Sequence, residues 1–245
     1  MLTLPAVTLV AGETRAHELT KIALEDALQK ATFGEVLIYT DKPDQIAIPG
    51  ARVIEIPDFA TKQEFERYVY CHTNEHIRTS HLLYMEWDAG IADPTMWSDD
   101  FLTYDYIGAP WWYGDGLNVG NGGFALRSRK LMDHLAEMKD RPFTDDLLCR
   151  SYRPELERKG LLWAPNAVAH DFAFECCRPS SHSKHFGYHA MRNWPFVLSN
   201  EDLARRFKIA ASNPYISGTI MVRDTINSAP WLMETTDGSQ RSGPA

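Results

Sequence analysis

The alternation of short apolar runs with amphipathic segments in the first half of the chain limits its fold most strongly. Runs short enough for buried strands lie at residues 7–12, 35–41, 52–56 and 80–86, and helical periodicity lies at residues 17–30 and 62–79. Helices that stand between strands act as crossovers between parallel strands. We therefore expect an α/β fold with a mostly parallel, Rossmann-like sheet flanked by helices.

The second half is less regular, with helices expected at residues 127–139, from residue 144 onward, and at residues 198–207. No internal repeat and no linker divides the chain. We expect one domain over residues 1–233. The last segment, 234–245, is polar and contains Gly, Ser and Pro, so we expect it to be disordered.

Composition excludes several classes of protein. With 25 Lys and Arg against 33 Asp and Glu, the net charge is −8, which argues against a general nucleic-acid binder. No apolar run is long enough for a membrane helix, and no secretory signal is evident. The four cysteines, Cys71, Cys149, Cys176 and Cys177, fit reduced thiols better than a disulfide framework, and we expect a cytoplasmic protein.

Acidic side chains follow the strand at residues 80–86. Ligands of parallel sheets bind beyond the carboxyl ends of the strands, so residues 12–14, 40–41 and 86–88 are expected to line one crevice. Asp88 precedes Ala89-Gly90 and can bind Mg²⁺ or Mn²⁺ there. The alternative is that Asp88 only caps a turn.

A glycine-rich segment, Gly120-Asn121-Gly122-Gly123, leads into an apolar run that begins at Phe124 and is expected to be a strand. It matches neither G-x-G-x-x-G nor a Walker loop. Several glycines together indicate a backbone that is pressed against another group. A simple β-turn would explain one Gly-Asn-Gly step but not the whole run.

Three segments together carry a resemblance: DYIGAPW at 105–111, VGNGGFALRS at 119–128 and FGYH at 186–189. They resemble a bacterial family of glycosyltransferase-like domains without assigned function, which is similar to nucleotide-sugar transferases of the GT-A fold. The resemblance implies a GT-A-like domain, a nucleotide-diphosphate-sugar donor, a carbohydrate or other hydroxyl acceptor, and Mn²⁺ or Mg²⁺ as cofactor.

The resemblance also implies roles for single residues. Asp88 and His189 would bind the metal, and Glu86 occupies the first position of an Asp-x-Asp motif, where its role stays open. Asp145 or Asp146 would be the catalytic base; the alternative is an ordinary acidic helix start. The residues expected around the nucleotide sugar are Thr8, Ala11, Glu13, Asp41, Glu86, Trp87, Asn121, Gly122, Gly123 and Phe124.

The leading hypothesis is a metal-dependent, inverting glycosyltransferase, in which Arg127 either pairs with phosphate or is a solvated residue at a helix start. The alternatives are a sugar nucleotidyltransferase and a non-catalytic module that binds nucleotides or carbohydrates. Trp111-Trp112-Tyr113 would form an acceptor-binding rim or a subunit contact. Two further histidine patterns, H-x-x-E-H at 72–76 and His182 with His185 and His189, are weak signals for a zinc site.

Overall fold

The computed structural model describes residues 1–176 and 184–233 of the chain. The chain divides into two compact units, Met1–His189 and Ala190–Ala245. The segment predicted to be disordered, 234–245, lies outside the described residues, as do Cys177 and His182. No helix in the described part of the chain combines the length and the apolar character that crossing a membrane requires.

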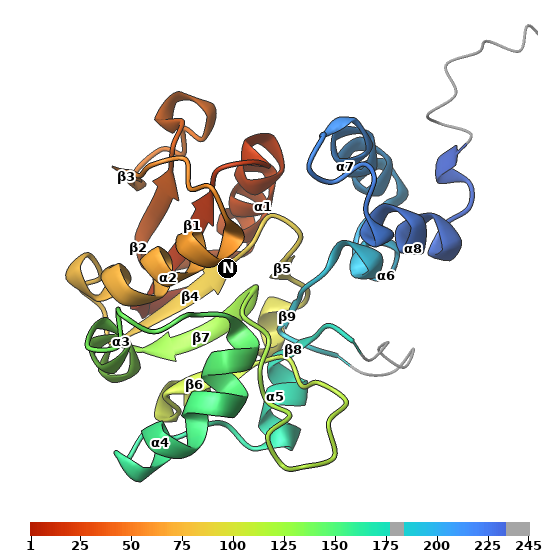
Figure 1. Ribbon diagram of the computed structural model, residues 1–245. Coiled ribbons are helices and arrows are strands. Elements are labelled where there is room, and N and C mark those ends of the chain that lie inside the picture. The colour runs from red at the N-terminus through yellow and green to blue at the C-terminus, as the bar shows by residue number, and fades with distance from the viewer. Residues whose placement is uncertain (177–183, 234–245) are drawn as a thin grey trace, which may run out of the picture. The chain divides into compact units, whose positions relative to one another are not determined.

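The first unit is built on a six-stranded sheet with the strand order β3-β2-β1-β4-β7-β6 (Figure 1). Its strands are β1 (Leu2–Glu13), β2 (Ala31–Thr40), β3 (Arg52–Glu55), β4 (His81–Met85), β6 (Tyr106–Gly108) and β7 (Phe124–Ser128). The first four strands pair in parallel, whereas β7 is antiparallel to both β4 and β6. The predicted α/β class with a mostly parallel sheet is confirmed.

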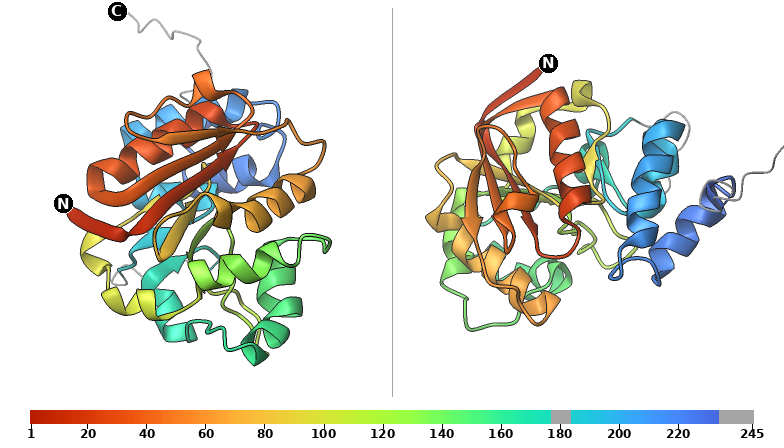
Figure 2. Two further views of the ribbon diagram at one scale, coloured as in Figure 1. Left: turned by 90° about the vertical axis from the view of Figure 1, so that its left-hand side faces the viewer. Right: turned by 90° about the horizontal axis from the view of Figure 1, so that it is seen from above.

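Two crossovers cover opposite faces of this sheet. Helix α1 (His17–Lys30) connects β1 to β2, and helix α2 (Lys62–His72) connects β3 to β4. The two connections run in opposite directions across the sheet, and right-handed crossovers then place their helices on opposite faces, as Figure 2 shows. The strand order reverses between β1 and β4, and a crevice at their carboxyl ends is the expected ligand site.

Helix α2 begins at a capping box and ends earlier than the sequence indicates. The Thr61 hydroxyl accepts a hydrogen bond from the Glu64 amide, and the Glu64 side chain accepts one from the Thr61 amide. The helix ends at His72, and a 3₁₀ turn, Thr73–Glu75, follows it. The helix predicted over residues 62–79 is therefore too long.

The helix predicted over residues 127–139 is wrong at its start. Strand β7 continues through Ser128, whose hydroxyl caps helix α3 (Arg129–Ala136) by accepting a hydrogen bond from the Leu131 amide at 3.0 Å. Arg127 therefore belongs to the strand and is only 1% exposed. The alternative of a solvated Arg127 at a helix start is excluded.

A second, three-stranded sheet brings the late part of the unit to the end of β4. It consists of β5 (Gly90–Ile91), β9 (Gly187–Tyr188) and β8 (Ala173–Phe174) in this order. Gly90 pairs with Tyr188 in an antiparallel register, so the residue after β9, His189, comes next to the segment that carries Asp88. The remaining helical elements of the unit include a π-helical turn, Leu147–Tyr152, with α4 (Arg153–Arg158) and α5 (Asn166–Phe172).

The second unit is helical in its described part. Its helices are α6 (Trp194–Val197), α7 (Asn200–Ser212) and α8 (Ile220–Ser228), preceded by a 3₁₀ turn, Met191–Asn193. Ser199 caps α7 by accepting a hydrogen bond from the Asp202 amide. The helix predicted over residues 198–207 is present but extends to Ser212.

Close packing of backbone against backbone yields a stability prediction at Gly108 in β6. A Cβ at this position would lie 1.7 Å from the carbonyl oxygen of Gly120, whereas a Cβ at Gly114 would meet nothing within 4 Å. We expect Gly108→Ala to lower the free energy of unfolding by about 2 kcal/mol or more. Gly114→Ala is the matched control. Urea denaturation measures both variants, and equal midpoints would contradict the packing described.

Candidate metal centre at the end of strand β4

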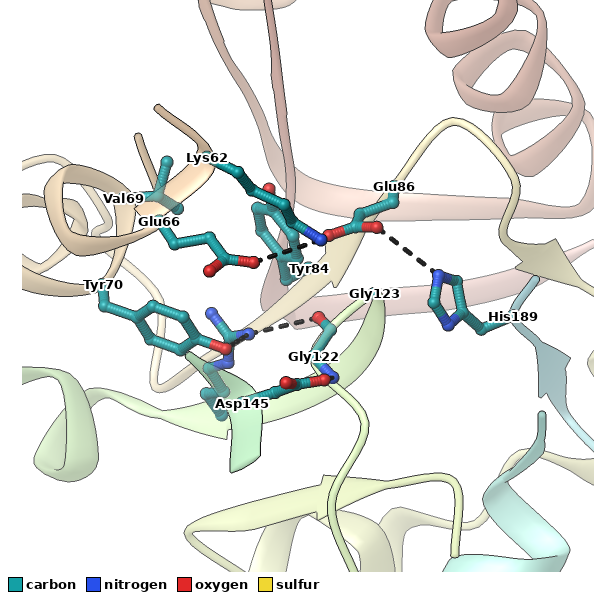
Figure 3. A pocket seen from close by; sticks show the side chains of 11 residues that line it. Lys62, Glu66, Val69, Tyr70, Tyr84, Glu86, Gly122, Gly123, Asp145 and His189 are labelled. Carbon is teal, nitrogen blue, oxygen red and sulfur yellow. Dashed lines mark hydrogen bonds and ion pairs between the residues drawn. The ribbon is translucent and has the colours of Figure 1, made fainter. Parts of the chain in front are cut away.

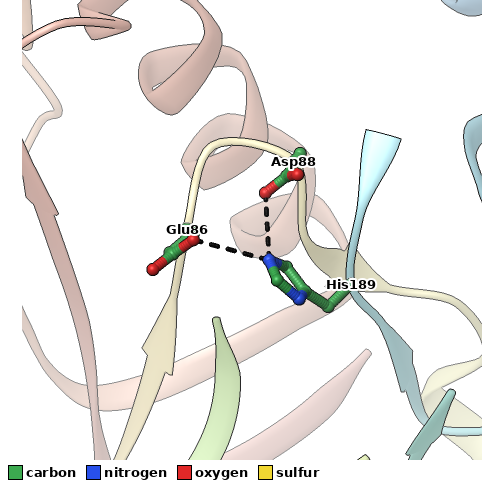
Figure 4. Close-up of side chains that lie close together, drawn as sticks. All are labelled: Glu86, Asp88 and His189. Carbon is green, nitrogen blue, oxygen red and sulfur yellow. Dashed lines mark ion pairs between the residues drawn. The ribbon is translucent and has the colours of Figure 1, made fainter. Parts of the chain in front are cut away.

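Three potential metal ligands meet where β4 ends. Glu86, Asp88 and His189 each offer one ligand atom, and these atoms lie within 4.8 Å of one another (Figure 4). The His189 Nε2 atom lies 3.2 Å from Asp88 Oδ1 and 3.4 Å from Glu86 Oε2. Two carboxylates and one imidazole suit Mn²⁺ or Mg²⁺ in their donor chemistry. The predicted metal ligands Asp88 and His189 are thus brought together, and Glu86 joins them.

The other nitrogen of His189 faces groups that fix the ring. Its Nδ1 atom lies 3.4 Å from Glu175 Oε1 and 2.7 Å from Asn121 Nδ2. A carboxylate behind a ligating histidine is a common device for orienting the ring and directing Nε2 toward a metal. Asn121 has a positive φ of 60°, and its side-chain oxygen accepts a hydrogen bond from the Phe124 amide.

The glycines of the segment 120–123 are explained by close approach of the protein's own side chains. A Cβ at Gly123 would lie 2.2 Å from His189 Nε2, and one at Gly120 would lie 2.1 Å from the Trp111 ring. These two glycines therefore make room for the metal-site histidine and for a tryptophan. The backbone is pressed against another group, as the sequence predicted.

Opposite charges balance the acids of this site. Burial alone would raise the pKa of Glu86, but attraction to Lys62 and His189 outweighs burial and holds this pKa at about 2. Burial also opposes ionisation of Glu175, whose pKa is nevertheless held at about 2 by its hydrogen bond with His189. Burial would lower the pKa of His189, but Asp88 and the neighbouring glutamates raise it well above its usual value.

A small polar cavity adjoins the cluster of Glu86, Asp88 and His189. It has a volume of about 40 Å³ and is lined, among others, by Lys62, Glu66, Arg127, Asp145 and His189 (Figure 3). Lys62 Nζ forms an ion pair with Glu66 at 3.3 Å. Pockets that enclose whole small molecules measure roughly 300–1,000 Å³. This cavity therefore suits one end of a ligand, such as a hydroxyl group with its carbon.

The two predicted base residues have different positions. Asp145 lines the cavity, where its carboxylate accepts hydrogen bonds from the Gly122 amide at 3.1 Å and from the Asp146 amide at 2.8 Å. The Asp146 side chain is 56% exposed and forms an ion pair with Arg150 at 3.5 Å. The geometry thus favours Asp145 over Asp146 as a group that meets a ligand.

Arg127 forms the buried floor of the same cavity. Its Nη2 atom donates hydrogen bonds to the Tyr70 hydroxyl at 3.0 Å and to the Gly122 carbonyl at 3.2 Å. The guanidinium also lies over the rings of Tyr70 and Tyr84, at 4.2 and 5.0 Å from their centres. Buried cation–π contacts of this kind stabilise a charge that has left water. Arg127 fixes the position of Gly122 and, through it, that of Asp145.

The structure places the other predicted nucleotide-sugar residues away from this cavity. Thr8 and Ala11 are buried in β1, and the Thr8 hydroxyl lies 2.7 Å from that of Thr79. Phe124 packs against Phe172 and Phe186 in the core. Trp87 lies half-buried in the turn between Glu86 and Asp88.

Glu13 and Asp41 lie at the carboxyl ends of β1 and β2, as predicted, but their carboxylates already have protein partners. Glu13 accepts hydrogen bonds from the amides of Thr14 and Arg15. Asp41 Oδ1 lies 2.7 Å from His17 Nε2, and both side chains are buried. The fold itself therefore uses the carboxylates of both Glu13 and Asp41.

The two weaker histidine patterns do not form metal clusters among the described residues. His72 pairs with Glu75 at 3.1 Å, and the His76 ring packs near Tyr39. His185 Nδ1 lies 2.5 Å from the His170 carbonyl oxygen, and His182 is not described. The one cluster found in the described part is that of Glu86, Asp88 and His189.

Sequence reasoning missed Glu175, Lys62 and Glu66. Glu175 lies on a segment that is irregular in sequence, and only the pairing of β8 with β9 brings it to His189. Lys62 and Glu66 are spaced i, i+4 at the start of α2, which is a common pattern for a solvated ion pair. No local signal distinguishes this pair from others in the chain.

The buried environment of Glu66 yields a prediction about pH. Burial, opposed by Lys62, raises the pKa of Glu66 from 4.5 to about 7. The folded state therefore holds this proton more tightly than the unfolded state, so stability from this group is present below about pH 4.5 and is lost as pH rises to about 7. The variant Glu66→Gln has no carboxyl group to titrate at this position. We therefore expect its free energy of unfolding, measured relative to that of wild type, to be higher at pH 8 than at pH 4.5 by on the order of 1 kcal/mol.

Urea denaturation at both pH values, with EDTA present, measures this difference against the wild-type protein. Glu18→Gln, at an exposed position on α1, is the control. If Glu66→Gln and Glu18→Gln show the same pH dependence, the burial assigned to Glu66 is wrong.

Comparisons with known proteins agree with this fold. No curated protein matches the sequence. A solved structure described as a glycosyltransferase involved in the glycosylation of the major capsid of PBCV-1 is similar over 76% of this chain and 92% of its own, with a TM-score of 0.50 and 10% identity. A mycobacterial protein aligns with 51% of this chain and 53% of its own at 11% identity, with a TM-score of 0.38. The first likeness shows a fold shared with a glycosyltransferase.

A family model matches residues 53–189, which is more than half of the chain and includes β4, the glycine segment, Asp145 and His189. The family has no assigned function, in agreement with the resemblance seen in the sequence. The chain thus belongs to the family described as "Protein of unknown function (DUF5672)".

Proposed function

We propose that this protein is a metal-dependent glycosyltransferase with a GT-A-like fold, which transfers a sugar from a nucleotide-diphosphate-sugar to an acceptor hydroxyl. One observation carries the proposal: Glu86, Asp88 and His189 come together at the topological switch point of the sheet, beside a cavity that contains Asp145. The fold shared with a solved glycosyltransferase supports it.

The metal centre explains how an acidic protein would hold a diphosphate. Glu86, Asp88 and His189 would bind Mn²⁺ or Mg²⁺, and Glu175 would orient the histidine. The bound cation would offset the negative charge that develops on the departing nucleoside diphosphate. Lys62, which the charge of Glu86 attracts, adds a second positive charge on the same side of the cavity.

Asp145 is the proposed general base. Two backbone amides hold its carboxylate in place, and the cavity beside it admits a hydroxyl group. Asp145 would take the proton of the acceptor hydroxyl as that oxygen attacks the anomeric carbon and the diphosphate leaves. Direct displacement by one nucleophile inverts the configuration of the sugar.

The proposed donor extends from the metal centre toward the carboxyl ends of β1 and β2. The base and ribose would lie near Glu13 and Asp41, and the donor sugar near Trp87 and the segment 121–123. We propose that residues 1–233 carry this activity as one domain.

The metal centre yields a prediction about ligand binding. We expect Mn²⁺ together with UDP or GDP to raise the melting temperature of the wild-type protein, because a ligand that binds only the folded state stabilises it. Asp88→Asn removes one ligand charge and should abolish the shift. Asp133→Asn, which changes an exposed acid on α3, is the matched control and should keep it. A shift that survives Asp88→Asn would place the metal elsewhere.

The different surroundings of Asp145 and Asp146 yield a prediction about catalysis. With a panel of nucleotide sugars and Mn²⁺, release of nucleoside diphosphate is measured for both variants. We expect Asp145→Asn to lower the rate by about 100-fold to 10,000-fold, the usual contribution of a general base. Asp146→Asn changes an exposed side chain and should stay within about threefold of wild type. The reverse order would assign the base to Asp146.

A further inference from the structure

The loop between β6 and β7 carries an exposed aromatic side chain. Trp112 is 70% exposed, although large apolar side chains are normally buried. Trp111 and Tyr113, on either side of it, are partly buried and pack edge to face at 5.8 Å. Trp112 is therefore the outward-facing member of an aromatic cluster.

The loop is held in place at its base and along its side. The Trp111 amide donates a hydrogen bond to the Asn118 carbonyl at 2.6 Å, and Pro110 pairs with Val119. Asn118 also donates a side-chain hydrogen bond to Asn166 of α5 at 2.7 Å. A loop that is closed in this way loses little conformational entropy when a ligand binds to it.

Arg150 connects this loop to the base residue. Its guanidinium lies 3.7 Å from the centre of the Tyr113 ring and forms an ion pair with Asp115 at 2.7 Å. On its other side it pairs with Asp146, the residue after Asp145. The Trp111 ring also packs on Gly120, two residues before the glycine whose amide binds Asp145. Arg150 and the glycine segment therefore contact both the aromatic cluster and the part of the chain that carries the proposed base.

We propose that Trp112 is a stacking platform for a pyranose ring of a carbohydrate acceptor. This inference rests on the proposed function and identifies its acceptor class. One face of many pyranoses presents C–H groups, which fit the flat, electron-rich face of an indole ring. A Cβ at Gly114 or Gly116 would meet nothing within 4 Å, so the loop leaves open space at these two positions.

The size of the exposed apolar surface favours a sugar over a protein partner. A stable protein interface buries about 800 Å² on each partner. In the described part of the first unit, the large exposed apolar side chains are those of Met1, Trp112 and Leu162. Trp112 is the single member of this set in the loop, which matches one sugar ring.

The test measures glycan binding directly and does not require turnover. Saturation-transfer NMR is recorded with methyl glycosides of glucose, galactose, mannose and rhamnose and with their disaccharides. We expect at least one glycan to receive saturation on the C–H face of one ring. Trp112→Ala should weaken its binding by about tenfold, and Trp112→Tyr should retain most of it. Tyr215→Ala, an exposed aromatic of the second unit, is the control and should bind as wild type does.

Two results would overturn the platform. The first is a failed binding test: either no glycan receives saturation, or Trp112→Ala binds the glycan as wild type does. The other is that light scattering shows an oligomer for wild type and a monomer for Trp112→Ala, which would make this loop a subunit contact. Stabilisation by Mn²⁺ with UDP or GDP should be unchanged in Trp112→Ala. If Mn²⁺ with UDP or GDP does not stabilise wild type although the glycan still binds, the proposed transferase activity is contradicted. Glycan binding at Trp112 would then remain supported.

Discussion

The position of the His189 ring against the backbone of Gly123 is the contact on which the rest of the site depends. No side chain larger than hydrogen fits at Gly123, because a Cβ there would lie 2.2 Å from Nε2 of the ring. The pairing of β9 with β5 delivers the histidine to this place from a segment far along the chain. Once the ring is there, Asp88 and Glu86 lie on one side of it and Glu175 on the other. The glycine segment thus acts through the protein's own side chains.

This arrangement gathers several acids into a small volume, and the fold balances them with few positive charges. Lys62 and His189 lower the pKa of Glu86, while Arg127 contributes a buried guanidinium between two tyrosine rings. Asp145 is stabilised by backbone amides. A divalent cation bound here would add positive charge where the carboxylates converge. The acidity of the chain and its proposed affinity for a diphosphate are thereby compatible.

Much of the first half of the fold could be predicted from the sequence, because local pattern determines it. Helix α1 has the predicted limits, and the four parallel strands lie within two residues of them at their carboxyl ends. A strand was predicted directly after the glycine segment, where β7 begins, but strand β6 and the antiparallel pairing of β7 were not, since pairing direction has no signature in a short apolar run. Arg127 was misplaced for a related reason: strand and helix meet at Ser128, and the sequence has no breaker there.

The site was predictable in part. Asp88 follows from its place after an apolar strand, and the pairing of Asp88 with His189 follows from the family resemblance. The choice of Asp145 over Asp146 needed the structure, because adjacent residues differ only in the direction of their side chains. Glu175, Lys62 and Glu66 depend on contacts between distant segments and had no local signal. Thr8, Ala11 and Phe124 lie on strands of the central sheet, as expected. Their side chains, however, are buried in the core.

The most direct test of the metal centre is anomalous X-ray scattering from crystals grown with MnCl₂ and UDP or GDP. Data on both sides of the manganese edge locate the ion independently of any assumption about the protein. We predict one strong peak at about 2.2 Å from a carboxylate oxygen of Asp88 and from Nε2 of His189, with diphosphate oxygens completing its coordination. A manganese peak at another place, or a nucleoside diphosphate bound without any metal at Asp88, would contradict the account.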